Sequence, residues 1–261
     1  MIESMNNQQI KNIIQLQRKA KIRGSQNVFV VEGPKMVCEA PNNDLVRIYI
    51  SETFYSEGLK SGICPWEGRD YEIVTDKVFK EMSDTQTPQG ILAVVKQKKY
   101  SLETVIGKGK PLLLILESIQ DPGNLGTIIR TAEGAGVSGI VMNKGTVDIY
   151  NPKTIRSTMG SIYRMPFIYA EDFYGTIQTV RQNGIYLYAA HLGGEKDYDD
   201  ADYTTACGFL IGNEGRGLDG QTAAMADEYI KIPMSGSVES LNAAVATALL
   251  SYEARRQRNK S

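Results

Sequence analysis

The chain has 261 residues, 42% of them hydrophobic and 23% charged, and its 29 basic and 30 acidic side chains leave a net charge of −1. This balance excludes disorder by charge excess, and the length allows two ordinary domains or one large α/β domain. No apolar run reaches the roughly 18 residues that a membrane-spanning helix needs, so we expect a cytoplasmic protein with no membrane partner. The three scattered cysteines and the single histidine, His191, predict neither a disulfide scaffold nor a metal site.

The first hundred residues open with a basic segment and continue as an alternating pattern. A helix is predicted over residues 6–22, and no acid occurs between Ser4 and Val31. The basic side chains in this segment are Lys11, Arg18, Lys19, Lys21 and Arg23. Such a segment would suit a polyanion such as RNA, and it would equally suit the solvated face of an N-terminal helix.

Short apolar runs then predict the strands of a first α/β domain, over residues 1–100. These runs are 28–31, 45–51, 71–74 and 91–95. Helices are predicted after Pro34 and over 76–82, with an irregular connection at 58–70. The polar, glycine-containing stretch 101–110 is predicted to be the linker to a second domain.

Residues 111–261 show a stronger α/β alternation. Strands are predicted at 112–116, 139–142, 167–169, 185–190, 208–211 and 229–232. Helices are predicted near 124–135, 151–160, 172–183, 219–226 and 241–258. Continuous apolar strands between helices indicate a mainly parallel sheet covered on both faces, whose ligands bind beyond the carboxyl ends of the strands.

Three loops of this second domain carry glycines and polar groups directly after an apolar strand. In the first, Asn124 is predicted at the start of a helix and Arg130 follows within two turns, so the pair is either a helix cap with a surface arginine or a phosphate contact. The second, residues 212–217, reads Gly-Asn-Glu-Gly-Arg-Gly, which is neither a dinucleotide fingerprint nor a P-loop. The third runs from Ile232 to Asn242, where Ser240 or Asn242 is predicted to cap an alanine-rich helix.

Together these loops resemble the three motifs of the SpoU (TrmH-like) branch of the SPOUT RNA methyltransferases. The family's Asn followed six residues later by Arg matches Asn124 and Arg130, and its Gly-Asn-Glu-Gly loop matches residues 212–215. Its Ile-Pro-Met and Ser-Leu-Asn match residues 232–234 and 240–242. The stretch 18–33 also resembles the start of the RNA-binding domain that many of these proteins carry.

The resemblance implies an α/β fold with two parts: a C-terminal trefoil-knotted SPOUT methyltransferase domain and a smaller N-terminal α/β RNA-binding domain. It implies S-adenosylmethionine as cofactor, RNA as partner, no metal, and a homodimer whose active sites are made by both chains. The cofactor contacts that it implies are Ala190, His191, Gly212, Asn213, Gly215, Ile232, Met234 and Leu241.

The implied reaction is methyl transfer to a ribose 2′-OH, with Asn124, Arg130, Glu214, Ser240 and Asn242 as the catalytic polar groups. Glu214 is the ordinary base by residue type, while proposals for the family favour the arginine. Because a guanidinium stays protonated at physiological pH, we expect Arg130 to grip the phosphate beside the target ribose.

Other functions stay open at this stage. The substrate is expected to be ribosomal RNA, because tRNA-modifying relatives often have shorter extensions, with tRNA as the alternative. An RNA-binding protein that has lost catalysis is a further alternative. A hydrolase built on His191 would need a nucleophile elbow, which the sequence lacks. The acidic run 195–202 lacks an EF-hand pattern and is predicted to be a surface loop.

Overall fold

The structure is a computed structural model that describes residues 1–237 and 240–260. Two compact units alternate along the chain: residues 1–98 and 148–163 form the N-terminal unit, and residues 99–147 and 164–261 form the C-terminal unit. The predicted domains, residues 1–100 and 111–261 with a linker at 101–110, stay a prediction. The compact units differ from them in that residues 148–163 group with the N-terminal unit.

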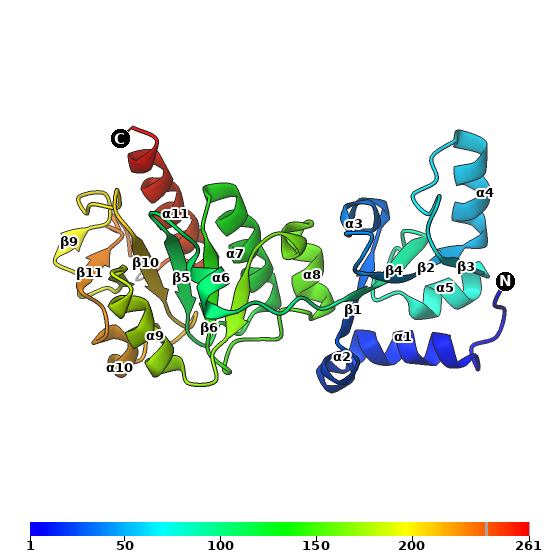
Figure 1. Cartoon of the computed structure of the whole chain (residues 1–261), viewed down its shortest axis with the longest axis horizontal. Helices are drawn as coiled ribbons and strands as arrows, with labels where there is room; N and C mark the ends of the chain where they lie inside the picture. The colour runs from blue at the N-terminus through cyan, green and yellow to red at the C-terminus, as the bar shows by residue number, and fades with distance from the viewer. Residues whose placement is uncertain (238–239, 261) are drawn as a thin grey trace. The chain divides into compact units, whose positions relative to one another are not determined.

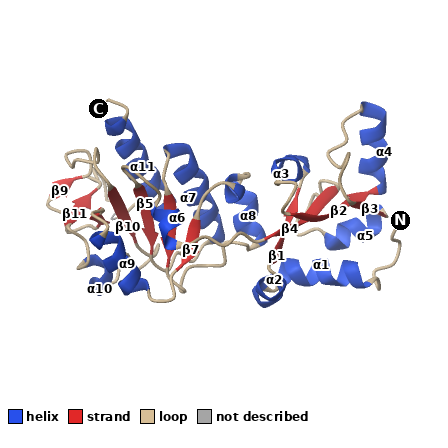
Figure 2. Cartoon of the chain, viewed as in Figure 1, coloured by secondary structure: helices blue, strands red, loops and turns tan. Residues whose placement is uncertain are grey.

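The N-terminal unit is a four-stranded sheet with helices on its faces (Figures 1 and 2). Its strands are β1 (Val28–Glu32), β2 (Leu45–Ser51), β3 (Tyr71–Val74) and β4 (Ile91–Lys96), in the order β1-β4-β2-β3. Its helices are α1 (Gln8–Arg18), α2 (Ala20–Gln26), α3 (Pro34–Glu39), α4 (Glu52–Ser61), α5 (Asp76–Met82) and α8 (Pro152–Thr158). β4 is antiparallel to β1 and β2, whereas β2 and β3 are parallel.

The two faces of this sheet have separate coverings. Apolar side chains of α1 and α5, such as Ile13 and Phe79, form one buried cluster with residues of all four strands. On another part of the sheet the ring of Phe29 lies 4.6 Å from the ring of Tyr150, and the hydroxyl of Tyr163 donates to the carbonyl of Met36 at 2.9 Å. The segment 148–163 is thus part of the core of the N-terminal unit.

The predicted helix over residues 6–22 is broken at Lys19, whose backbone is extended. Arg23 lies just beyond the break and donates to the carbonyls of Leu16 and Gln17, at 2.6 and 3.1 Å, which the end of α1 leaves without helical partners. Its Nε also donates to the carboxylate of Asp148 at 3.1 Å, and the residue is only 3% exposed. The prediction that Arg23 contacts RNA is therefore wrong, because its guanidinium is used inside the unit.

The C-terminal unit is a seven-stranded sheet between helices (Figure 1). Its strands are β5 (Leu112–Leu116), β6 (Gly139–Met142), β7 (Phe167–Tyr169), β8 (Tyr186–Ala190), β9 (Lys196–Asp197), β10 (Cys207–Ile211) and β11 (Glu228–Lys231). Its helices are α6 (Leu102–Ile106), α7 (Pro122–Ala135), α9 (Phe173–Gln182), α10 (Gly220–Ala223) and α11 (Ala243–Arg258). All pairings between these seven strands are parallel, which confirms the predicted sheet type.

The strand order is β7-β6-β5-β10-β8-β11-β9. It places β5 between β6, the next strand in the chain, and β10, which comes much later. At such a switch point the loops after neighbouring strands diverge and leave room for a ligand. β9 was not predicted, because its two residues lie in the acidic run that reads as a surface loop.

The predicted linker 101–110 is not an open connection, because it contains α6. Val105 of this helix is fully buried in the core of the C-terminal unit. A Cβ on Gly139 would lie 2.5 Å from the carbonyl oxygen of Val105, so the helix packs directly on the backbone of β6. Within the described part of the chain, no helix has the length and apolarity that crossing a bilayer requires.

Candidate active site

The loops after β8, β10 and β11 surround a cavity of about 370 Å³ at the carboxyl end of the sheet. All the residues predicted to contact the cofactor lie in its wall, namely Ala190, His191, Gly212, Asn213, Gly215, Ile232, Met234 and Leu241. The structure therefore brings together residues that are up to 51 positions apart in the sequence, Ala190 and Leu241. Whether they hold a cofactor stays a prediction.

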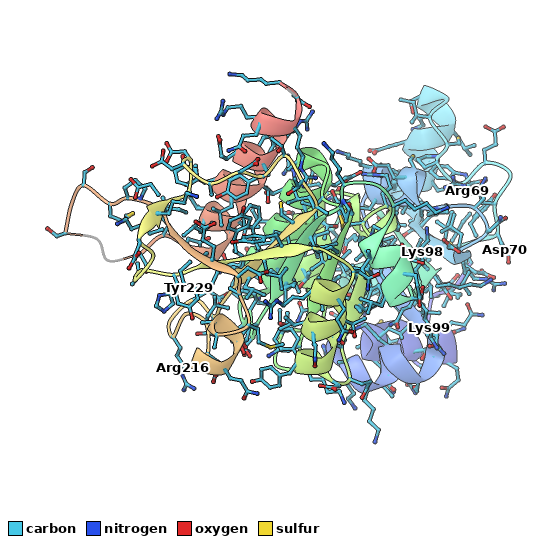
Figure 3. The ribbon with its side chains drawn as sticks, turned by 60° about the vertical axis from the view of Figure 1, so that its left-hand side comes forward. Arg69, Asp70, Lys98, Lys99, Arg216 and Tyr229 are labelled. Carbon is cyan, nitrogen blue, oxygen red and sulfur yellow. The ribbon has the colours of Figure 1, made fainter. Side chains whose placement is uncertain are left out.

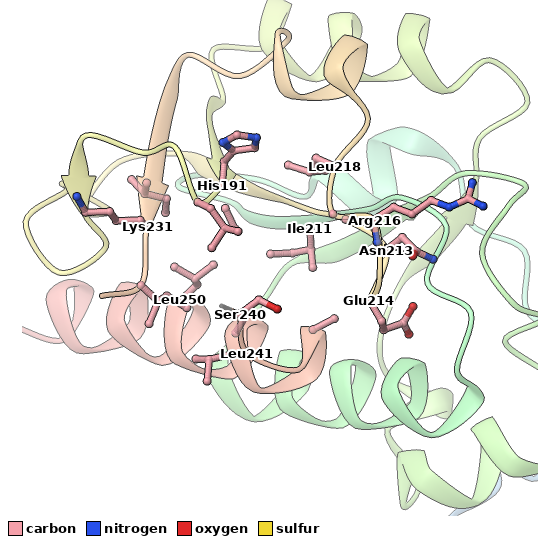
Figure 4. A pocket seen from close by; sticks show the side chains of 18 of the residues that line it. His191, Ile211, Asn213, Glu214, Arg216, Leu218, Lys231, Ser240, Leu241 and Leu250 are labelled. Atoms are coloured by element: carbon pink, nitrogen blue, oxygen red, sulfur yellow. Dashed lines mark hydrogen bonds between the residues drawn. The ribbon is translucent and has the colours of Figure 1, made fainter. Parts of the chain in front are cut away.

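The interior of the cavity is mainly apolar. Figure 4 shows the side chains of Ile211, Leu218, Leu241 and Leu250 around it, with Glu214 and Arg216 at one end and Lys231 at the other. Apolar walls with a few polar groups at the rim are typical of sites for small organic molecules, and the volume lies within the usual range for such sites.

The loop 212–217 is closed on itself and leaves no space for a side chain at its first residue. The backbones of Asn213 and Gly217 exchange hydrogen bonds at 3.0 and 2.9 Å. A Cβ on Gly212 would lie 2.2 Å from the backbone of Gly217 and of Leu218. The glycine at position 212 is thus required by close approach of the backbone.

The side chain of Asn213 builds this loop from within. Its Oδ1 accepts from the backbone N–H groups of Gly215 and Arg216, at 2.9 and 3.1 Å, and its Nδ2 donates to the carbonyl of Ser118 at 2.8 Å. All these groups belong to the chain itself, so Asn213 shapes the wall of the cavity and joins it to the loop after β5.

Glu214 connects the second loop to the first. Its carboxylate accepts from the backbone N–H groups of Gln120 and Asp121, each at 3.1 Å, and from the Nδ2 of Asn124 at 3.0 Å. Partial burial raises the pKa of this carboxyl, but the hydrogen bonds from Asn124 and the two backbone groups outweigh burial and hold the pKa below its ordinary value. Glu214 is therefore ionised at neutral pH and its oxygens are engaged, which makes it a poor proton acceptor.

Asn124 and Asn242 extend the connection to the third loop. The Nδ2 of Asn242 donates to the Oδ1 of Asn124 at 3.0 Å, while the Oδ1 of Asn242 accepts from the backbone N–H of Ala244 at 2.9 Å. The prediction that Asn242 caps the last helix is confirmed. Glu214, Asn124 and Asn242 thus form one hydrogen-bonded chain across the three loops, which we call the three-loop network.

The predicted capping role of Asn124 is wrong. α7 begins at Pro122, and its cap is Asp121, whose side chain accepts from the backbone N–H of Asn124 at 2.9 Å. An aspartate directly before a proline at the first helical position is a usual helix start, so the sequence contained the signal. The side chain of Asn124 is left free to join the network.

The two remaining catalytic candidates lie at different places. Ser240 lines the cavity and is exposed. Arg130 is exposed on α7 and does not line the cavity; six residues of helix set it about 9 Å along the axis and about 240° around it from Asn124. Among residues 1–237 and 240–260, no hydrogen bond or ion pair engages the guanidinium of Arg130.

Sequence reasoning missed Glu117, which comes directly after β5 and is only 7% exposed. Its carboxylate accepts from the backbone N–H of Asp219 at 2.8 Å and from the hydroxyl of Thr222 at 2.6 Å. It therefore anchors the chain that leaves the second loop. A charged residue at the carboxyl end of a buried strand is the signal that could have identified it.

The other candidates from the sequence have ordinary surroundings. Lys11, Arg18, Lys19 and Lys21 are all exposed on α1, on α2 or between them. His191 accepts from the backbone N–H of Gly193 at 3.0 Å, and its ring lies 5.2 Å from that of Tyr229. In the described residues, histidine, cysteine, aspartate and glutamate do not gather into a group that could hold a metal ion.

The chain is similar to known proteins along nearly its whole length. The family model described as "SpoU rRNA Methylase family" matches residues 111–252, and that of an "MRM3-like substrate binding domain" matches residues 7–93. A Bacillus subtilis protein, the 23S rRNA (guanosine(2553)-2′-O)-methyltransferase RlmP, is 33% identical over 97% of this chain and 98% of its own.

Two solved structures resemble the fold closely. The AdoMet-bound rRNA methyltransferase from Sinorhizobium meliloti has a TM-score of 0.85 and 31% identity, covering 98% of this chain and 97% of its own. The SpoU methyltransferase AviRb from Streptomyces viridochromogenes, in complex with AdoMet, has a TM-score of 0.86 and 25% identity, covering 98% and 100%.

Proposed function

The chain belongs to the SpoU rRNA methylase family, and on this basis we propose that it transfers the methyl group of S-adenosylmethionine to a ribose 2′-OH of ribosomal RNA. The observation that carries the proposal is that the second and third family motifs line one cavity, while hydrogen bonds from Asn124 to Glu214 and from Asn242 to Asn124 join the first motif to them. Ribosomal RNA is favoured over tRNA because the similarity to a 23S rRNA methyltransferase extends over 97% of the chain.

The cavity suits S-adenosylmethionine in its size and its lining. Its apolar side chains suit a planar base, and its glycine-rich wall brings backbone donors and acceptors close to a ligand. Gly212, Ile232 and Leu241 are the residues that we expect to hold the cofactor, with His191 beside them. Two structures of similar proteins contain AdoMet, which supports this assignment.

Bound S-adenosylmethionine supplies a methyl group already activated on a sulfonium sulfur, so the chain has mainly to align the ribose hydroxyl and exclude water. Glu214 acts as a positioning residue, since its carboxylate holds the loop after β5 and the side chain of Asn124. Asn124, Ser240 and Asn242 are the polar groups nearest to an incoming ribose. Arg130, exposed and unpartnered among the described residues, is the group that grips the phosphate beside the target.

The N-terminal unit binds a further part of the RNA. Its contacts are the exposed basic residues Lys11, Arg18, Lys19 and Lys21. The match of residues 7–93 to a substrate-binding domain supports this role. We expect the protein to meet its RNA in the cytoplasm.

The active form is a homodimer that uses one face of α11. Val245, Leu249 and Tyr252 are 48%, 37% and 50% exposed, and their spacing places them on the same side of this helix. An exposed apolar stripe of this kind favours a second protein surface over water.

The trefoil knot of the C-terminal unit also stays a prediction.

The test of the proposed function compares ribose methylation in cells with and without the gene. We expect one position of ribosomal RNA to lose its resistance to alkaline cleavage when the gene is absent, and the purified protein to restore it with labelled S-adenosylmethionine. Loss of a tRNA methylation alone would identify tRNA as the substrate. Tight binding of ribosomal RNA with no labelled product would indicate an inactive RNA-binding protein.

A further inference from the structure

Arg216 is an exposed arginine at the rim of the cavity that the three-loop network does not use. The arginines of the C-terminal unit fall into two groups, according to whether the guanidinium has a hydrogen-bond partner. Arg164, Arg181, Arg255, Arg256 and Arg258 donate to carboxylates or carbonyls of the same unit. Arg130 and Arg216 are the two whose guanidinium groups have no partner among the described residues.

The other cations at the cavity are already paired. Lys231, which also lines the wall, has its ammonium 3.9 Å from the carboxylate of Asp197. Lys196, nearby on β9, has its ammonium 3.1 Å from the carboxylate of Glu228. Within residues 1–237 and 240–260, Arg216 is therefore the cation at this rim that has no anionic partner.

The backbone that carries Arg216 is fixed. Its own N–H donates to the Oδ1 of Asn213, and the loop is closed by the exchange of hydrogen bonds between Asn213 and Gly217. The side chain points outward from the unit in Figure 3, and in Figure 4 its guanidinium points away from the cavity interior. A fixed backbone with an outward guanidinium suits a ligand that lies across the rim rather than one that is buried inside.

We propose that Arg216 is a positioning residue that binds a phosphate of the RNA strand at the rim of the cavity, a contact separate from Arg130 and from the basic residues of α1 and α2. This proposal rests on the proposed function, since it names the substrate contact of the same site. A guanidinium matches a phosphate with two parallel hydrogen bonds, whereas an ammonium provides only a point charge.

The test measures methyl transfer to an unmodified 23S rRNA transcript by full-length wild-type protein, Arg216→Ala and Arg216→Lys. We expect Arg216→Ala to raise the KM for RNA about tenfold, with kcat within about twofold of wild type. The dependence of log KM on log salt concentration should lose about one unit of slope, because one phosphate contact is gone. Arg216→Lys should keep the slope and recover only part of the KM.

The matched control is Lys108→Ala, which removes one exposed positive charge before β5, at the amino end of the sheet. We expect it to leave both KM and the salt slope unchanged. The affinity of Arg216→Ala for S-adenosylmethionine, measured by calorimetry, should also equal that of wild type. An Arg216→Ala protein that loses cofactor affinity but keeps its KM for RNA would assign Arg216 to the cofactor and overturn the proposal.

Binding of the same transcript without cofactor separates this inference from the proposed function. If wild type binds the transcript but transfers no methyl, the proposed function fails, and the salt slope of binding by Arg216→Ala still tests the contact. An unchanged slope and affinity in Arg216→Ala would overturn the inference, whether or not wild type is active.

Discussion

Replacing Glu214 by glutamine tests whether the three-loop network holds the active site. The carboxylate accepts three N–H groups, and a glutamine amide in its place has one oxygen and one NH₂, so at least one backbone donor would face another donor. Losing one hydrogen bond to a partly buried charge costs about 1.5 kcal/mol. For a protein of this size that corresponds to a fall of about 3–6 °C in Tm.

The free energy of the lost hydrogen bond, about 1.5 kcal/mol, also limits how far Glu214→Gln can weaken cofactor binding. If S-adenosylmethionine binds only when the loop 212–217 is in place, the Kd of Glu214→Gln should rise by no more than about tenfold. Thermal unfolding followed by circular dichroism and calorimetric titration measure the two effects. The matched control is Glu195→Gln, the same chemical change at an exposed carboxylate.

The pH dependence has a definite sign. Because the folded-state pKa of Glu214 lies below its ordinary value of 4.5, the carboxylate stabilises the fold above that value, and the contribution is lost as the pH falls through the folded pKa. The difference in Tm between wild type and Glu214→Gln should be constant from pH 8 to about pH 6 and shrink below about pH 4.5. Equal melting of the two proteins at pH 7 would refute the reasoning. Normal melting and cofactor binding with no methyl transfer would instead make Glu214 the base.

Three further substitutions test a glycine of the cavity wall, the buried arginine of the N-terminal unit and the exposed arginine of α7. Gly212→Ala should weaken S-adenosylmethionine binding about tenfold or more in calorimetry, because its Cβ would lie 2.2 Å from backbone. Gly220→Ala, whose Cβ would have no atom within 4 Å and which does not line the cavity, should bind normally. Arg23→Ala should destabilise the N-terminal unit by about 3 kcal/mol, because it removes a buried guanidinium from the partly buried Asp148 and from the carbonyls of Leu16 and Gln17. Denaturation followed by the fluorescence of the single tryptophan, Trp66, measures this, and the exposed Lys21→Ala should change it little. Arg130→Lys should keep Tm and cofactor affinity and lose at least about tenfold in labelled methyl transfer; full activity would exclude two-pronged phosphate binding.

The sequence allowed the strands and the cavity wall to be predicted for a common reason. Runs such as 112–116 and 208–211 are buried on both faces, so their apolar character is continuous and their ends are sharp. The loops that follow such strands meet at one edge of a parallel sheet, so glycines and polar residues there are brought together by topology alone.

The errors have different causes, and only one of them involves a partner that is distant along the chain. Arg23 reads as a surface cation until Asp148, 125 residues later, is known to lie beside it. Asn124 reads as a cap because asparagine is common there, although Asp121 before Pro122 was the better candidate. Residues 101–110 read as a linker from their glycines and lysines, whereas α6 packs on the core through the buried side chain of Val105 and the partly buried Leu102 and Ile106.

The position of residues 148–163 in the sequence governs the order in which the N-terminal unit can be completed during synthesis. The ring contact between Phe29 and Tyr150, and the hydrogen bond from Tyr163 to the carbonyl of Met36, cannot form until residues 99–147 have been synthesised. At usual translation rates that interval is about 2–10 s. Strands β5 and β6 of the other unit leave the ribosome before the first unit has its full core. A gene fragment that ends at residue 100 would therefore encode a sheet that lacks the packing of Tyr150 and Tyr163.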